Sequence, residues 1–118
     1  MYGRPLSNTD LAATLCAGSP SLRELLRCHV ANYGTLIPHV FMGDVLACAG
    51  RCAASEAGGD RAELRHILDT LENGISHGDR ETRNAIAISF AADAQLETFF
   101  AYLKPLMGPR MRAAFATG

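Results

Sequence analysis

The sequence predicts an all-α protein, a compact antiparallel array of about six or seven helices in a single domain that covers residues 1–118. Three observations lead to this prediction. The chain has 118 residues, the length of one ordinary domain. Hydrophobic residues make up 48% of it and charged residues 19%, so a core can form. Alanine is abundant, whereas the aromatic residues are only five Phe and three Tyr, a mixture that favours close-packed helices over a β-sandwich.

The first two helices are expected where capping residues precede amphipathic runs. A short helix should begin with Asn8 or Thr9 as its N-cap. A second helix should be capped by Ser19 or Ser21, and it should end at Gly34, because glycine readily adopts the left-handed conformation that ends many helices.

The next two helices form the middle of the chain. Pro38 restarts a helix that should run to about Ser55, with Gly43 allowing close approach by a neighbour. Asp60 follows a glycine-rich linker and is the expected N-cap of a helix that ends near Ile75. The apolar stripe of this helix consists of Leu64, Ile67, Leu68, Leu71 and Ile75.

Three more helices are expected in the last third. Asp79 should cap a helix over residues 80–94, which is apolar enough to be buried nearly all round. A helix over residues 94–104 is bounded by Pro105, and a last short helix follows Gly108 and Pro109. Two of the expected helices begin with Asp-Arg, at residues 60–61 and 79–80. This match is too short to establish a repeat, so HEAT-like helical hairpins stay an open alternative.

The charge balance restricts the partners. Eleven basic and twelve acidic residues give a formal net charge of −1, which argues against binding to a nucleic-acid backbone. No run of about 18 apolar residues could span a membrane. The first residues lack the apolar segment of a secretion signal, so we expect a cytoplasmic protein.

The cysteines could supply a metal or redox site, although burial in the core is the simpler interpretation. Cys48 and Cys52 are four residues apart on an expected helix, so their sulfurs share a face and could bind zinc. The other possible ligands, Cys28, His29 and His39, are on different segments. In a reducing compartment we expect free thiols rather than disulfides, and neither a metal nor a cofactor.

The histidines are spread singly along the chain. His29 falls on an apolar stripe and should belong to the core, His66 should face solvent and His77 should lie in a turn. His39 starts a helix, with Asp44 about one and a half turns later, where its ring could meet a partner. Spacing identifies no nucleophile or carboxylate to work with His39, and no catalytic motif is present, so we expect no enzyme.

Carboxylates are concentrated between residues 60 and 97. If the helices on either side of the turn from Ile75 to Asp79 are antiparallel, several carboxylates form an acidic rim that suits a basic partner. An ordinary solvated helix face explains the same pattern. The residues concerned are Glu63, Asp69, Glu72, Asp79, Glu81, Asp93 and Glu97.

Four segments resemble elements of a known family. They are LIPHVFMGD at residues 36–44, LDTLE at 68–72, GDRETRNAIAISF at 78–90 and LMGP at 106–109. Together they resemble a group of small, all-helical, largely uncharacterised bacterial proteins with an LPHxxxGD element, an LE … GDxEVxNxIAVSFxE element and a late LGP. The sequence departs from this pattern at residues 91–93 (Ala91, Ala92 and Asp93), where the family more typically has an acidic residue directly after the Phe position.

Some members of this group resemble immunity proteins of polymorphic or contact-dependent toxin systems. The resemblance implies a helical protein that neutralises a cognate toxin in a tight complex and blocks its active site without catalysis. A helical adaptor or regulatory interaction domain is the first alternative, and a small metal- or thiol-dependent protein that uses Cys48, Cys52 and a histidine is the second. The residues expected to contact the toxin are His39, Asp44, Glu72, Asp79, Glu81 and Arg83.

Overall fold

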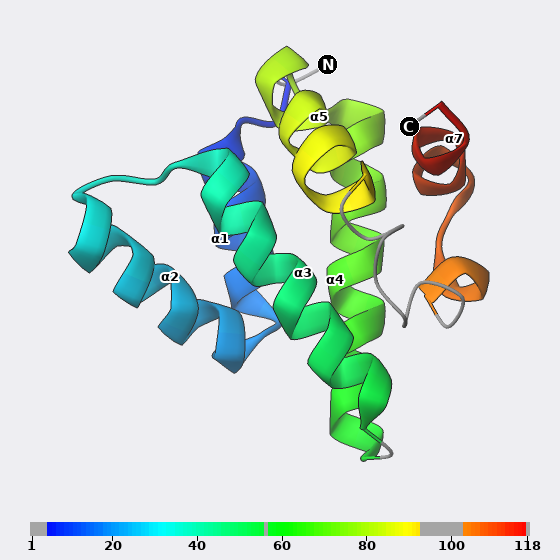
Figure 1. Ribbon diagram of the computed structural model, residues 1–118, viewed down its shortest axis with the longest axis horizontal. Helices are drawn as coiled ribbons and strands as arrows, with labels where there is room; N and C mark the ends of the chain where they lie inside the picture. The colour runs from blue at the N-terminus through cyan, green and yellow to red at the C-terminus, as the bar shows by residue number, and fades with distance from the viewer. Residues whose placement is uncertain (1–4, 56, 93–102, 118) are drawn as a thin grey trace.

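The computed structural model describes residues 5–55, 57–92 and 103–117, and every named element within these ranges is a helix (Figure 1). The all-α prediction is therefore confirmed. The β-structure of the described residues is limited to one isolated bridge between Leu6 and Gly78. The elements are α1 (Asn8–Ala17), α2 (Pro20–Tyr33), α3 (Pro38–Ala54), α4 (Gly58–His77), α5 (Arg80–Ile86), the π-helix η1 (Ala87–Ala92), the 3₁₀ turn η2 (Lys104–Leu106) and α7 (Pro109–Thr117).

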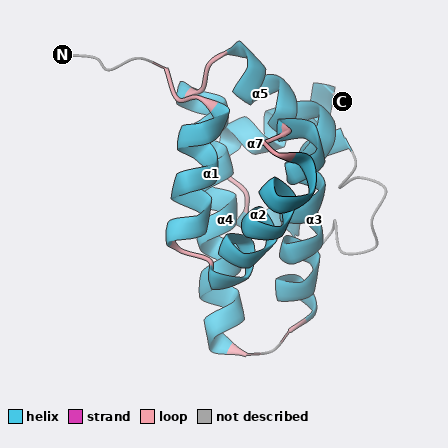
Figure 2. Ribbon diagram, turned by 90° about the vertical axis from the view of Figure 1, so that its left-hand side faces the viewer, coloured by secondary structure: helices cyan, strands magenta, loops and turns pink. Residues whose placement is uncertain are grey.

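The longest helix, α4, is the centre of the fold. It contacts α1, α3, α5 and α7, whereas α2 packs against α1 and α3 on the side away from α4 (Figures 1 and 2). Helices α3 and α4 form an antiparallel pair joined at one end, and η1 packs against α3 and α7. The predicted stripe of α4 faces the core: Leu64, Ile67, Leu68 and Leu71 are almost completely buried, and Ile75 is partly buried against them.

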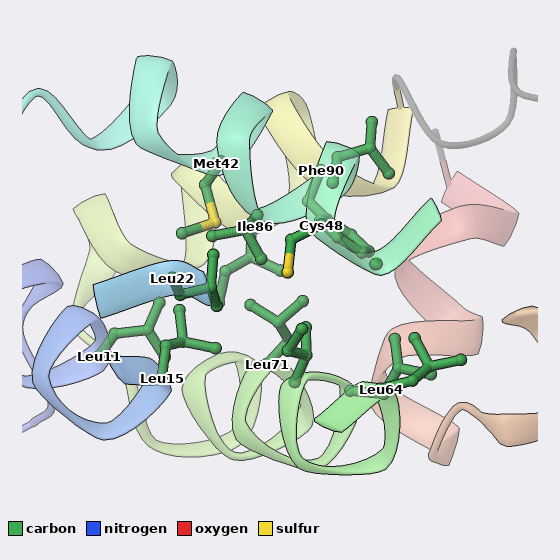
Figure 3. Close-up of a cluster of buried hydrophobic side chains, with 14 of the residues drawn as sticks. Leu11, Leu15, Leu22, Met42, Cys48, Leu64, Leu71, Ile86 and Phe90 are labelled. Atoms are coloured by element: carbon green, nitrogen blue, oxygen red, sulfur yellow. The ribbon is translucent and has the colours of Figure 1, made fainter. Parts of the chain in front are cut away.

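The core lies between α4 and the helices that cover it (Figure 3). It is aliphatic and rich in sulfur, as expected from a chain with few aromatic residues. Its largest fully buried side chains are Phe41, Phe90, Leu11, Leu15, Leu22, Met42, Leu64, Ile67, Leu68, Leu71, Ile86 and Leu103.

Two of the expected caps were wrong by a few residues. The N-cap of α1 is Ser7, not Asn8 or Thr9, and Ser7 forms a reciprocal capping box with Asp10. Helix α4 begins at Gly58 without a side-chain cap, so Asp60 lies in its first turn instead of preceding it. The first shift follows from the capping box, in which the Ser7 hydroxyl and the Asp10 carboxylate each accept a backbone N–H at the start of α1.

Other expected ends are confirmed. Ser19 caps α2 by accepting the N–H of Leu22, and Gly34 ends α2 in the left-handed conformation with φ of 77°. Pro38 starts α3, and the Asp79 carboxylate caps α5 by accepting the N–H of Thr82 at 2.8 Å. Each position therefore carries the residue type that its backbone geometry favours.

The expected helix over residues 80–94 differs from the prediction in form and burial. It is an α-helix to Ile86 and then widens into the π-helix Ala87–Ala92. Ile86 and Phe90 are fully buried, but Ile88 is 57% exposed, so the segment is not buried all round. The regular alternation of apolar residues concealed this difference, because composition does not show which face meets a neighbour.

The expected helix over residues 94–104 lies almost entirely outside the described residues. Its last part is described: Leu103 is fully buried and Pro105 lies within η2. The final helix, α7, begins at Pro109 as predicted, and Met111 on it is fully buried. Among the described residues, no helix has the length and hydropathy needed to cross a membrane.

Two further expectations were wrong. Gly43 is exposed and a Cβ there would meet no neighbour, so it allows no close approach. His66 does not face solvent. It is half-buried, with Nε2 lying 2.9 Å from the carbonyl oxygen of Thr14 and 3.2 Å from that of Leu15 at the end of α1.

Candidate interaction surface

Helix α5 is held in place by the short segment that precedes α1. The N–H of Leu6 donates to the carbonyl of His77 at 2.9 Å, and the Leu6 carbonyl accepts the N–H of Asp79 at 2.7 Å and the Thr82 hydroxyl at 3.1 Å. Hydrogen bonds to Leu6 thus connect the turn between α4 and α5 to the segment that precedes α1. The predicted residues Glu81 and Arg83 are exposed on this fixed helix.

One side of α5 forms a hollow with the start of α3. This hollow, of about 280 Å³, is lined by Asn8, Pro38, His39, Glu81 and Asn84. The structure therefore brings together two of the six predicted contact residues, His39 and Glu81. The exposed His39 ring is oriented by its Nδ1, which lies 2.6 Å from the Ser89 hydroxyl on η1.

The other side of α5 forms a larger hollow, of about 470 Å³, that contains three arginines. Among the described residues, its charged lining consists of Arg80, Arg83 and Arg110 and includes no carboxylate. All three arginines are exposed, and none has an ion-pair partner among the residues that the structure describes. Asn84 lines both hollows, so α5 separates a site with Glu81 and His39 from a cationic site. The remaining lining residues of the larger hollow are Ile75, Asn84, Ala87 and Ala113.

Two other predicted contact residues have a capping role. The Glu72 carboxylate accepts the N–H of Arg110 at 3.1 Å and that of Met111 at 2.9 Å, which caps the first turn of α7. Asp79 caps α5, and the N–H of Thr82 is the main reason that the pKa of Asp79 is lowered, with a smaller contribution from the charge of Arg83. Neither carboxylate lines either of the two hollows beside α5.

The sixth predicted residue, Asp44, is half-buried on α3, one turn after the exposed Val40. Val40 is 42% exposed and Ile88 on η1 is 57% exposed. Val40 and Ile88 thus lie on α3 and η1, the two elements that the contact between His39 and Ser89 joins. Exposed apolar side chains that polar groups surround can contribute buried apolar area to a protein interface.

Sequence reasoning missed Arg80, Asn84, Arg110 and Ile88. The spacing of Arg80 and Arg83, three residues apart on a capped helix, was a usable signal because such residues share a helix face. No sequence signal places Arg110 beside them. That contact depends on the packing of α7 against α4 and η1.

The cysteine pair lies in a separate cluster on the far part of α3. The sulfur atoms of Cys48 and Cys52 and a carboxylate oxygen of Glu63 all lie within 4.8 Å of one another. The predicted histidine ligand is therefore replaced by Glu63. His39 contacts Ser89, and the buried His29 accepts the N–H of Ile37 at 2.9 Å through Nε2. Cys28 is exposed on α2, and the four thiols are free.

Comparisons with known proteins identify a family but no activity. A family model described as a domain of unknown function (DUF7674) matches residues 12–117. The search of curated proteins found no match, and neither did the search of solved structures.

Proposed function

From the premise that the chain belongs to the DUF7674 family, a domain of unknown function, we propose that it is a binding protein that neutralises a cognate bacterial toxin. In this proposal it acts as an immunity protein, forming a tight one-to-one complex that covers the toxin's active site. The proposal rests on the resemblance of four sequence segments to proteins of that kind and on one structural observation: three arginines share a hollow, and no residue that the structure describes forms an ion pair with them.

Three guanidinium groups in one hollow repel one another unless an anion lies among them. Water and salt screen most of this repulsion while the groups are exposed. A partner carboxylate that entered the hollow would be desolvated next to Arg80, Arg83 and Arg110, and arginine forms paired hydrogen bonds with such groups. The hollow is therefore suited to an acidic side chain on the partner's surface.

The neighbouring hollow has the opposite preference. Glu81 offers a carboxylate and the adjacent His39 offers a ring whose orientation Ser89 fixes. A basic partner side chain would fit here. One hollow favours an acidic partner side chain and the other a basic one, and both lie along the same helix. A partner would therefore bind in one orientation, because the reversed orientation would place like charges together.

The available surface is large enough for such a complex. A stable interface covers about 800 Å² on each partner, or about one eighth of the 6605 Å² accessible surface of this protein. In the proposed complex Ile88 and Val40 serve as apolar anchors and the charged hollows form the rim. Inhibition then requires only that the bound protein exclude the toxin's substrate.

The test is protection from a candidate toxin, taken as the product of the gene next to the one for this protein. Cells that express that toxin should grow when they also express this protein. They should lose protection when Arg80, Arg83 and Arg110 are all changed to Glu. The matched control is Arg65→Glu, an exposed arginine on α4 that lines a different hollow. Full protection by the triple variant would remove the arginine hollow from the interface, and no protection by the wild type would contradict the immunity proposal and favour an adaptor.

A further inference from the structure

The cluster of Cys48, Cys52 and Glu63 lies apart from the proposed interaction surface and has the composition of a metal site. Both cysteines are almost completely buried, at 3% and 1% exposed, on successive turns of α3. The Glu63 side chain is 10% exposed and reaches them from α4. Two sulfur ligands and one oxygen ligand from two packed helices thus converge on one point.

The geometry suits tetrahedral coordination. Cys52 Sγ lies 3.5 Å from Glu63 Oε1. Around a zinc ion with ordinary Zn–S and Zn–O lengths, a sulfur and an oxygen ligand are about 3.6 Å apart. The remaining ligand separations are no more than 4.8 Å, so small side-chain rotations would close the site. We propose that Cys48, Cys52 and Glu63 bind a single zinc ion, with the fourth position open to solvent.

The surroundings of Glu63 support this assignment. Its second oxygen accepts a hydrogen bond from the fully buried Ser19 hydroxyl, which also caps α2. A carboxylate held in this way is already oriented before a metal arrives, as ligands in metal sites generally are. Glu63 is therefore positioned by the fold.

The charges also balance. The Glu63 carboxylate lies 3.4 Å from the guanidinium of Arg51, so these two charges offset each other. Cysteine binds zinc as a thiolate, and each thiol that becomes a ligand releases one proton, so two cysteine ligands offset the two charges of the ion. The net charge of the cluster is the same before and after.

Arg51 covers the site from the solvent side. Its guanidinium lies 3.6 Å from Cys48 Sγ and 2.9 Å from the Ser21 hydroxyl, and its side chain is half-exposed. A long, half-exposed side chain can move aside and let an ion enter. Its alternative carboxylate partner, Asp60, lies 3.7 Å away.

Cobalt(II) is the appropriate probe, because it takes zinc sites and reports thiolate ligands by a sulfur-to-metal charge-transfer absorption. The reduced full-length protein should bind one Co²⁺ per chain with this absorption, and Zn²⁺ should displace it. Cys48→Ala and Cys52→Ala should each lose the absorption, whereas Cys28→Ala, which removes the exposed thiol on α2, should keep it. Circular dichroism establishes that each variant is folded.

Glu63→Gln provides a second test that leaves both thiols in place. It should keep a charge-transfer band and bind Co²⁺ about tenfold more weakly or worse, since an oxygen ligand loses its charge. The proposal is overturned if the wild type shows no charge-transfer absorption, if Cys48→Ala and Cys52→Ala retain it, or if Glu63→Gln binds as tightly as the wild type.

Discussion

The Glu72 carboxylate on α4 accepts the backbone N–H of Met111 in the first turn of α7 at 2.9 Å. The same carboxylate accepts the N–H of Arg110, and Gly108 fits against it so closely that a Cβ at this glycine would lie 2.6 Å from the carboxyl carbon. The segments LDTLE (68–72) and LMGP (106–109) thus meet in one contact. Glu72 and Gly108 are 36 residues apart in the sequence, and this contact brings them together in the fold.

Glu72→Ala should destabilise the protein by about 1–2 kcal/mol, because two backbone N–H groups at the start of α7 lose their acceptor. The free energy of unfolding from urea denaturation measures this. Asp69→Ala is the matched control, since Asp69 is exposed on the same helix. Equal losses for the two variants would mean that Glu72 does not hold α7.

The contact between His39 and Ser89 should also be measurable in isolation. In a double-mutant cycle with His39→Ala and Ser89→Ala, we expect a coupling energy of about 0.5–1.5 kcal/mol, the usual net contribution of a hydrogen bond. The two residues belong to the LPH and SF elements, which this contact joins. Strictly additive effects of the two changes would show that the contact does not form in solution.

Asp79 should make stability depend on pH in the acidic range. Its pKa is lowered in the folded protein, chiefly because its carboxylate accepts the N–H of Thr82. The ionised form is therefore favoured by folding, and its contribution is present above the ordinary pKa of an aspartate and lost as the pH falls through the lowered value.

The variant Asp79→Ala checks this prediction. The difference in unfolding free energy between wild type and variant should be largest near neutral pH and should shrink as the pH falls below the usual aspartate range. A constant difference across this range would contradict the assigned role of the Asp79 carboxylate.

The four thiols should differ sharply in reactivity when the protein is free of metal. Burial, with the nearby charges of Cys48 and Glu63, raises the pKa of Cys52 to about 12, so this thiol is protonated at neutral pH. Cys28 is the exposed cysteine, and it should be alkylated first. Mass spectrometry during alkylation of the folded chain should show one rapid addition, which Cys28→Ser abolishes. Rapid modification of Cys52 would show that the cluster is open.

Local signals in the sequence predicted most helices but not how their surfaces combine. Ser19, Gly34, Pro38 and Asp79 mark helix ends through backbone preferences that act over a few residues, and these predictions were confirmed. The exposure of Ile88 was missed because a π-helix and the packing of its neighbours decide it.

The candidate sites depend even more on tertiary packing. Arg110 lines the same hollow as Arg80 and Arg83 because α7 packs against α4 and η1, and Glu63 reaches the cysteines because α3 and α4 pair in antiparallel fashion. In both cases the residues are much farther apart in the sequence than the three or four positions over which helical spacing predicts a shared face. Conversely, Glu72 and Asp79 were expected to contact a partner, and the structure shows that their carboxylates cap helices.

The most direct test of the proposed function is the affinity of the purified protein for the purified candidate toxin, measured by isothermal titration calorimetry. The measurement compares the wild type with the triple variant Arg80→Glu, Arg83→Glu, Arg110→Glu. We predict a one-to-one complex whose affinity falls at least about 100-fold in the triple variant, because each charge reversal opposes a partner carboxylate. Arg65→Glu should bind like the wild type. Absence of binding by the wild type, or equal affinity of the triple variant, would contradict the account.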